Sequence, residues 1–159
     1  MEWCGNSAVR RRVCAAMPKN LTEAQRDEFL AGVHVAVLSV DAGGGRPPAS
    51  VPIWYDYTPG GLIRISTGAG SRKAKLIERA GAVTVVVQRE EPPYQYVVVE
   101  GSVVDIARHT PAEVSEAIAV RYLGEQAGRE FVRSMEGIDS VLFSIRPDRW
   151  LTADFSDEG

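Results

Sequence analysis

The chain has 159 residues, of which 45% are hydrophobic and 25% are charged, a composition typical of one globular domain. Its net charge of −3 argues against a generally basic surface for nucleic acid. No apolar run approaches the about 18 residues that a membrane-spanning helix needs. We therefore expect a cytoplasmic protein that binds neither nucleic acid nor membrane.

The N-terminal segment differs from the rest of the sequence because it shows no hydrophobic periodicity. It carries three consecutive arginines with no apolar stretch behind them, which argues against a secretory signal. We expect residues 1–18 to form a disordered tail and residues 19–159 to form a single domain, and Met17 is a candidate for the true start. Both cysteines lie in the tail without a nearby histidine, so neither a metal site nor a disulfide framework is predicted.

Four helices are predicted from capping signals and apolar periodicity. Thr22 and Gln25 form a capping-box pattern at the start of the first helix. Thr110, Pro111 and Glu113 form a similar pattern at the start of the third helix, with the threonine as N-cap. The expected helices span residues 22–31, 71–80, 110–123 and 125–135.

Six strands are predicted from segments that are β-branched, apolar or alternating. They span residues 34–40, 49–57, 62–67, 83–88, 94–105 and 141–145, and residues 147–155 are expected to form an extended tail. Pro52 places the second strand at an edge or a bulge, and Gly101 indicates a bulge or a close approach in the fifth strand. Consecutive hairpins make the sheet antiparallel and the fold α+β. A closed or partly closed barrel would hide the strand edges.

A glycine-flanked turn before the second helix carries the strongest functional signal. Gly68 and Gly70 resemble the start of a dinucleotide fingerprint, but Lys73 stands where the third glycine belongs and the strands are antiparallel. The turn instead presents Ser71, Arg72 and Lys73 at a helix N-terminus, where unpaired N–H groups and the helix dipole favour an anion such as phosphate. The alternative is a solvated helix face, although basic residues in a first turn oppose the dipole.

The surrounding sequence adds a resemblance to a known family. The segment Thr67-Gly-Ala-Gly-Ser-Arg-Lys-Ala74 follows a Leu-x-Ile-x-Ile strand and precedes a valine-rich strand. It resembles the phosphate-binding segment of the pyridoxamine 5′-phosphate oxidase family, which includes split-barrel reductases that use the deazaflavin coenzyme F420. The similarity covers roughly residues 22–105. It implies an antiparallel six-stranded split β-barrel with flanking helices, the FMN-binding split barrel, and a homodimer with the cofactor at the interface.

The resemblance also implies which residues bind the phosphate. Ser71, Arg72 and Lys73 would contact the phosphate oxygens, and Ser66 and Thr67 would flank them. Catalytic side chains stay unassigned, because in such proteins the cofactor itself carries the redox chemistry.

Three further residues are assigned to the cofactor ring by the same resemblance. Trp54 would stand near the ring, Tyr96 could hydrogen-bond a ring edge, and Trp150 resembles a tail residue that covers the cofactor from the partner subunit. Where the oxidase has basic residues at both ends of the ring-side strand, this chain has Val51 and Asp56. The departures predict that the chain is not a true pyridoxamine 5′-phosphate oxidase.

The sequence as a whole predicts a flavin- or deazaflavin-dependent oxidoreductase that transfers a hydride to or from a small organic substrate. The short, arginine-rich chain favours F420 slightly over FMN as the cofactor. One alternative is a non-catalytic carrier or sensor that binds FMN or F420 on the same fold. A dimer without any flavin is a third possibility.

Overall fold

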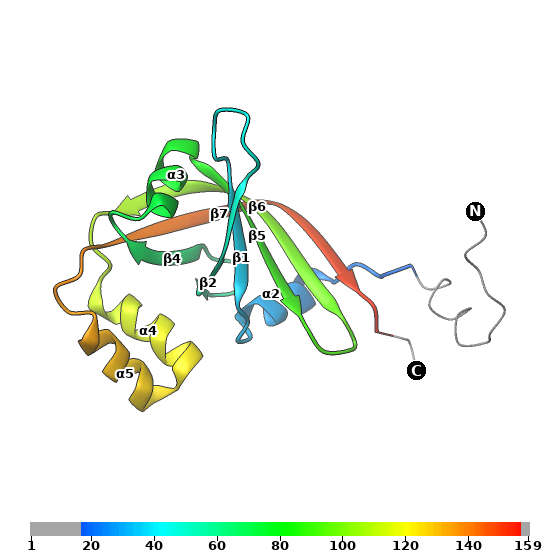
Figure 1. Ribbon diagram of the computed structural model, residues 1–159. Helices are drawn as coiled ribbons and strands as arrows, with labels where there is room; N and C mark the ends of the chain where they lie inside the picture. The colour runs from blue at the N-terminus through cyan, green and yellow to red at the C-terminus, as the bar shows by residue number, and fades with distance from the viewer. Residues whose placement is uncertain (1–16, 157–159) are drawn as a thin grey trace.

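The computed structural model describes residues 17–156 (Figure 1). The tail predicted over residues 1–18 therefore lies almost entirely outside the described residues. Near the start of the described range, Lys19 forms an isolated antiparallel bridge with Asp154, close to the other end of the chain. No helix in the described part of the chain is long and apolar enough to cross a membrane.

The helices lie close to their predicted positions. Their bounds are α2 Glu23–Ala31, α3 Arg72–Ala80, α4 Ala112–Leu123 and α5 Glu125–Ser134. The capping box of α2 is confirmed, because Thr22 and Gln25 each accept a hydrogen bond from the other's backbone N–H. The predicted N-cap at Thr110 is wrong. Pro111 precedes α4 without a side-chain cap, and the Thr110 hydroxyl is bonded to Ser66 instead.

The described strands form one antiparallel sheet of seven strands, not the six that were predicted. Their bounds are β1 Ala36–Val40, β2 Ala49–Ile53, β3 Asp56–Tyr57, β4 Ile63–Gly68, β5 Ala82–Arg89, β6 Gln95–Ala107 and β7 Ser140–Asp154. The extra strand arises because the segment 49–57 breaks at Trp54 and Tyr55 into β2 and β3. The segment 147–155, expected as a tail, is largely the second half of β7, where it pairs with β6.

The strand order forces the sheet to curl. The order is β2-β1-β5-β6-β7-β4-β3, so β2 and β3 lie at opposite edges although only Trp54 and Tyr55 separate them in the chain. Three residue steps span at most about 11 Å, and the two edges must therefore approach each other, which gives the half-barrel of Figure 1. Pro52 lies in the edge strand β2, as its missing N–H donor predicted.

The hydrophobic core fills the concave side of this half-barrel. Inward-facing residues on neighbouring strands meet in register, as Ile65 of β4 does with Phe143 of β7, and both are fully buried. The helices close the core with Leu30 from α2 and with Leu76 and Ile77 from α3. The apolar face of β4 therefore points into the core.

The helices α4 and α5 form a hairpin that lies outside this core (Figure 1). A Cβ atom at Gly128 of α5 would come within 2.6 Å of the Val120 backbone nitrogen of α4, so the two helix backbones nearly touch. The Arg121 guanidinium of α4 donates to the carbonyl of Leu30 at 2.8 Å and to that of Gly32. The hairpin is therefore tied to the barrel through α4.

Gly101 supplies a test of the packing between β6 and β7. It lies at a register shift between these strands, and a Cβ atom there would come within 2.5 Å of Ile145 Cγ2 and 2.9 Å of the Arg146 carbonyl. Because Ile145 is fully buried, we expect Gly101→Ala to lower the free energy of unfolding by roughly 1–3 kcal/mol, the usual cost of overpacking.

The matched control is Gly70→Ala, because nothing lies within 4 Å of the added methyl group there. Its effect should stay within about 0.5 kcal/mol. Urea denaturation of both variants measures the difference, and equal effects would contradict the close approach at Gly101.

Candidate functional site

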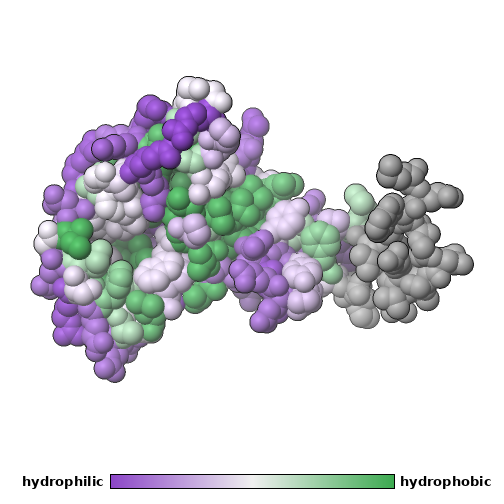
Figure 2. Space-filling view, in the orientation of Figure 1, coloured by the Kyte–Doolittle hydropathy of each residue, from purple (hydrophilic) through white to green (hydrophobic). Residues whose placement is uncertain are grey.

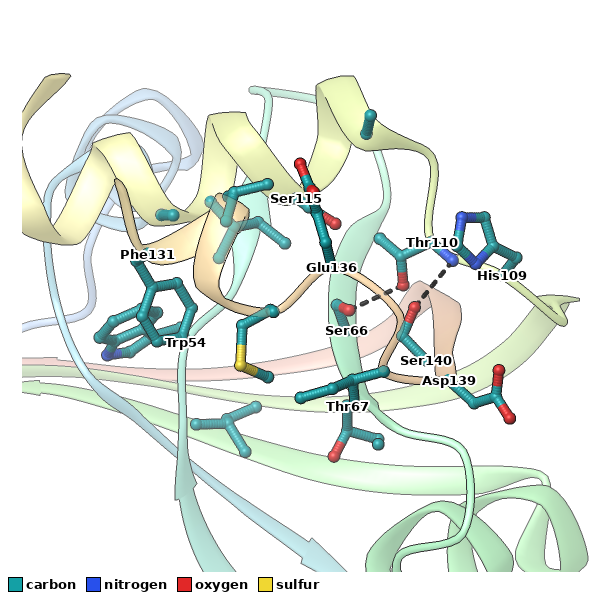
Figure 3. Close-up of a pocket in the computed structure, with 18 of the residues that line it drawn as sticks. Trp54, Ser66, Thr67, His109, Thr110, Ser115, Phe131, Glu136, Asp139 and Ser140 are labelled. Atoms are coloured by element: carbon teal, nitrogen blue, oxygen red, sulfur yellow. Dashed lines mark hydrogen bonds between the residues drawn. The ribbon is translucent and has the colours of Figure 1, made fainter. Parts of the chain in front are cut away.

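A pocket of about 710 Å³ opens between the α4–α5 hairpin, β4 and the link between β2 and β3 (Figure 3). This volume lies within the range of small-molecule sites. Segments far apart in the sequence form its walls. Trp54 comes from the link, Ser66 and Thr67 come from β4, Lys73 comes from α3 and Phe131 comes from α5. The fold alone brings these side chains together.

Three hydroxyl groups lie together in the pocket wall (Figure 3). The hydroxyl oxygens of Ser66 and Thr110 are 2.7 Å apart, and the Thr110 backbone N–H donates to Ser140 Oγ at 3.1 Å. Each hydroxyl carries one proton, and the Ser66–Thr110 bond uses one of the three. Among residues 17–156, this leaves two O–H donors of the group without a further acceptor.

The N-terminus of α3 opens toward the same pocket. Ser71 caps this helix by accepting a hydrogen bond from the Ala74 N–H at 3.1 Å. Lys73, in the first turn, lines the pocket and is partly buried, and this burial lowers the pKa of its ammonium group. No acidic side chain among residues 17–156 forms an ion pair with Lys73. An anion entering the pocket would stabilise both the lysine charge and the helix dipole.

Aromatic side chains form the other end of the pocket. The Trp54 ring stacks on Tyr122 with centroids 5.0 Å apart and planes 6° apart, and Phe131 lies 5.6 Å from Trp54 at a 57° tilt. The Tyr122 hydroxyl accepts from the Tyr55 N–H at 3.2 Å and donates to the His34 carbonyl at 2.6 Å. Tyr122 thus holds both the indole and the backbone next to it. In the described part of the chain, no three potential metal ligands cluster.

Solved structures match this fold, although no family model and no curated protein matches the sequence. A conserved hypothetical protein, Rv2991, from Mycobacterium tuberculosis superposes with a TM-score of 0.70 at 22% identity, over 85% of this chain and 86% of its own. An F420 reductase superposes with 0.64 at 21% identity, over 79% and 94%. A proposed pyridoxamine 5′-phosphate oxidase from Listeria innocua superposes with 0.58 at 16% identity, over 82% and 96%. The chain has the fold of pyridoxamine 5′-phosphate oxidase-like proteins.

This split-barrel fold gathers most of the predicted site residues at one pocket. Four of the eight line it directly, namely Trp54, Ser66, Thr67 and Lys73. Ser71 and Arg72 begin α3 immediately before Lys73, with Ser71 as the cap and Arg72 exposed. Asp56, at the position where the oxidase has a basic residue, forms an ion pair with Arg64, its cross-strand neighbour.

The remaining two predicted residues do not line this pocket. The Tyr96 ring lies 6.4 Å from that of Phe155, near the end of the chain. The Trp150 ring packs under the Arg26 guanidinium, which lies 3.9 Å from the ring centroid. Neither Tyr96 nor Trp150 is among the residues that line the pocket.

Several residues that the split barrel places in the pocket were not predicted from the sequence, including Thr110, Ser140, Phe131 and Met135. Thr110 fits a helix-cap pattern, which hid its role in the pocket wall. Phe131 and Met135 are four residues apart, and this spacing indicates one apolar helix face. The spacing could have revealed that face, but it could not have revealed that the face lines a cavity.

The hydroxyl pair in the pocket wall can be tested through its coupling energy. We expect Ser66→Ala and Thr110→Val each to lower the free energy of unfolding by about 1 kcal/mol, because each leaves its partner without a bond. The double variant should lose clearly less than the sum of the two, since the second change then removes no bond.

Urea denaturation of the two single variants and the double variant measures this coupling. The hydroxyls of Ser39 and Ser50 are also 2.7 Å apart but are exposed, so Ser39→Ala should cost less than about 0.5 kcal/mol. Strict additivity at Ser66 and Thr110 would show that the pair contributes no bond of its own.

Proposed function

We propose that this pocket holds the flavin-type cofactor of an oxidoreductase, F420 or FMN, with the cofactor phosphate at the start of α3. The observation that carries the proposal is Lys73, a partly buried cation without an acidic partner in the described residues, which faces a cavity of ligand size. Ser71, which caps α3, and the exposed Arg72 directly precede Lys73 in the chain, so the helix N-terminus and a second cation are next to it in sequence. The neighbours of this fold with flavin-related descriptions support the same cofactor class.

In this proposal each part of the wall has a separate task. Lys73 contributes a point charge to the phosphate, and Arg72 can offer two parallel N–H donors. Ser66 and Thr110 offer a hydroxyl donor next to the phosphate end. Trp54, held by Tyr122, limits where the cofactor ring can lie and excludes water from it. The bound cofactor would supply hydride transfer to or from a small organic substrate.

The alternative on the same fold is a non-catalytic carrier or sensor of FMN or F420. We favour an enzyme because one neighbour of this fold is described as an F420 reductase. Steady-state turnover with the reduced cofactor distinguishes the two, since a carrier binds the cofactor without oxidising or reducing a second compound. Side-by-side titration with FMN and F420 decides between the cofactors, for which F420 is our slight preference. Binding of neither would leave a dimer without a flavin.

The phosphate site generates the sharpest prediction of this proposal. We expect Lys73→Ala and Arg72→Ala each to weaken cofactor binding about tenfold to a hundredfold, because a hydrogen bond to a charged group contributes roughly 1.5–3 kcal/mol. Both variants should keep the melting temperature of the parent chain, since neither side chain belongs to the buried core. Fluorescence titration with FMN and with F420 measures the affinities.

The matched control is Lys75→Ala, which removes an exposed lysine from the same helix without touching the pocket wall. It should change the affinity less than about threefold, as expected for a screened surface charge. If Lys73→Ala and Lys75→Ala behave alike for both cofactors, the first turn of α3 is a solvated helix face and the proposed phosphate site fails.

We further propose a homodimer that assembles through the convex face of the sheet. Figure 2 shows hydrophobic side chains gathered over the middle of this face, around β1. Five strands contribute to one cross-strand row of outward apolar residues, namely Pro52, Val37, Val86, Val98 and Leu151. Leu151 remains 59% exposed, and a contiguous apolar face of this kind typically binds a partner. A second subunit could also bring Tyr96 and Trp150 to the pocket, as the resemblance implies.

The convex face predicts a specific effect on assembly. We expect the parent chain to be a dimer at micromolar concentration and Val37→Arg to be a monomer, because a charge within the row would be buried without a partner. Leu62→Arg changes a similarly exposed apolar residue outside the row and should leave the dimer intact. Light scattering after size-exclusion chromatography measures the mass, and a monomeric parent chain with bound cofactor would overturn this assembly.

A further inference from the structure

The pocket has two chemically different ends. Figure 3 shows Trp54 and Phe131 at one end and the hydroxyl groups of Ser66, Thr110 and Ser140 at the other. The first end offers apolar surface, and the second offers hydrogen-bond donors. A molecule that fills the whole pocket therefore needs an apolar part and a polar part.

The start of α3 adds a positive charge to the hydroxyl end. The Ser71 N–H donates to the Gly68 carbonyl at 3.0 Å, and Gly68 pairs with Ser140 across β4 and β7. The first turn of α3, with Lys73 in the pocket wall, therefore lies beside the hydroxyl groups. An anionic group is the polar part that suits this end, because both the ammonium group and the helix dipole attract it.

The acidic side chains of the lining do not cancel this positive charge. Glu136 and Asp139 line the pocket but are exposed, so water and salt screen their charges. Lys73 is half-buried instead, and this burial lowers the pKa of its ammonium group. Among residues 17–156, no acidic side chain forms an ion pair with it. An anion from outside the chain would therefore bind at Lys73.

The other end of the pocket has a rim of uncovered apolar side chains. Val35 precedes β1, Phe131 and Met135 lie at the end of α5, and Ile138 lies in the turn before β7. Their exposed fractions are 53%, 41%, 42% and 52% in that order. The Ile138 N–H donates to the Met135 carbonyl at 3.1 Å, which fixes the turn. Such side chains gain free energy when an apolar group covers them.

The uncovered rim suits a flexible chain. The Trp54 indole already contacts Tyr122 and Phe131, with ring centroids 5.0 Å and 5.6 Å away, so no further ring fits between these aromatic side chains. The other rim residues are not aromatic and come from three different segments. An unbranched alkyl chain can bend to contact each of them, and the flexible Met135 thioether can adapt to it.

We infer that the pocket binds a free fatty acid anion, with the carboxylate at Lys73 and the hydroxyl groups and with the alkyl chain along the rim. This binding goes beyond the proposed function, since it needs no cofactor. The carboxylate and the cofactor phosphate would both occupy the place beside Lys73, so the fatty acid would inhibit the oxidoreductase by competition. Only that consequence rests on the proposed function.

A series of straight-chain carboxylates tests the inference on the full chain. Calorimetric titration with hexanoate, octanoate and decanoate, each below its micelle concentration, should show affinity rising about two- to fourfold per added CH₂ group. Decanol has the same chain as decanoate but no charge, and it should bind about tenfold more weakly. Equal affinities across the three acids, or no binding of decanoate, would overturn the inference.

A charge variant locates the carboxylate. Lys73→Ala should lower the affinity for decanoate to that for decanol, and it should leave decanol binding unchanged. Lys75→Ala removes an exposed lysine of the same helix, outside the lining, and should change decanoate binding less than about threefold. Unchanged decanoate binding in Lys73→Ala would place the carboxylate elsewhere and overturn the inference.

Two rim variants locate the alkyl chain. Met135→Ser and Ile138→Ser should each weaken decanoate binding about five- to tenfold, and the double variant should flatten the rise with chain length. Leu123→Ser removes a similarly exposed apolar side chain of α4 outside the lining and should stay within twofold. Melting curves of the variants exclude a folding defect. If decanoate binds both rim variants as tightly as the parent chain, the inference is wrong.

Competition with FMN and F420 separates this inference from the proposed function. Decanoate should raise the apparent Kd of a bound cofactor, and binding without competition would place it outside the phosphate site and overturn the inference. If neither cofactor binds but decanoate binding still depends on Lys73 and Ile138, the proposed function fails and the fatty acid site stands. If decanoate binds to the Val37→Arg monomer but not to the parent dimer, a second copy covers the rim and the fatty acid site is overturned.

Discussion

The arrangement of this protein depends on a link of two residues between opposite edges of one sheet. Trp54 and Tyr55 carry the chain from β2 to β3, and this short tether holds the half-barrel closed. The link is fastened by polar groups in an apolar setting. Burial raises the pKa of the Tyr55 phenol, which stays protonated and donates to the Leu30 carbonyl at 2.7 Å. From outside the barrel, Arg121 of α4 donates to the Leu30 carbonyl and Tyr122 donates to the His34 carbonyl.

The pocket results from these contacts between α4 and the barrel. Because α4 is anchored at the link, its hairpin partner α5 is held over the end of the barrel, and Trp54 becomes a wall between the two. The half-buried Arg121 guanidinium lies at the C-terminal end of α2, where the helix dipole favours a cation. Fold closure and site geometry are therefore enforced by the same few side chains. Tyr122 of α4, for example, bonds to the backbone of the link and also fixes the position of Trp54 in the pocket wall.

Much of the fold follows from interactions within a few residues, and these were accessible from the sequence. The capping box at Thr22 is confirmed because it involves groups three positions apart, and the cap that Ser71 forms on α3 is equally local. The alternation that buries Ile65 is a property of any strand with one apolar face. The edge position of Pro52 follows from a missing donor. The cations at the start of α3 were likewise apparent from their spacing, although what they bind is still a proposal.

Only the tertiary structure decided where these local pieces meet. Thr110 satisfied a cap pattern with its neighbours, yet its hydroxyl lies against Ser66, 44 positions away in the chain. The strand predicted over residues 49–57 breaks at Trp54 because the chain crosses there to the opposite edge of the sheet. No residue pattern near Trp54 indicates this crossing. The same holds for Phe131, whose spacing on α5 shows an apolar face but not the cavity opposite. Sequence determined the elements because short-range contacts set them, whereas the pocket is made by long-range contacts whose partners become known only when the chain is folded.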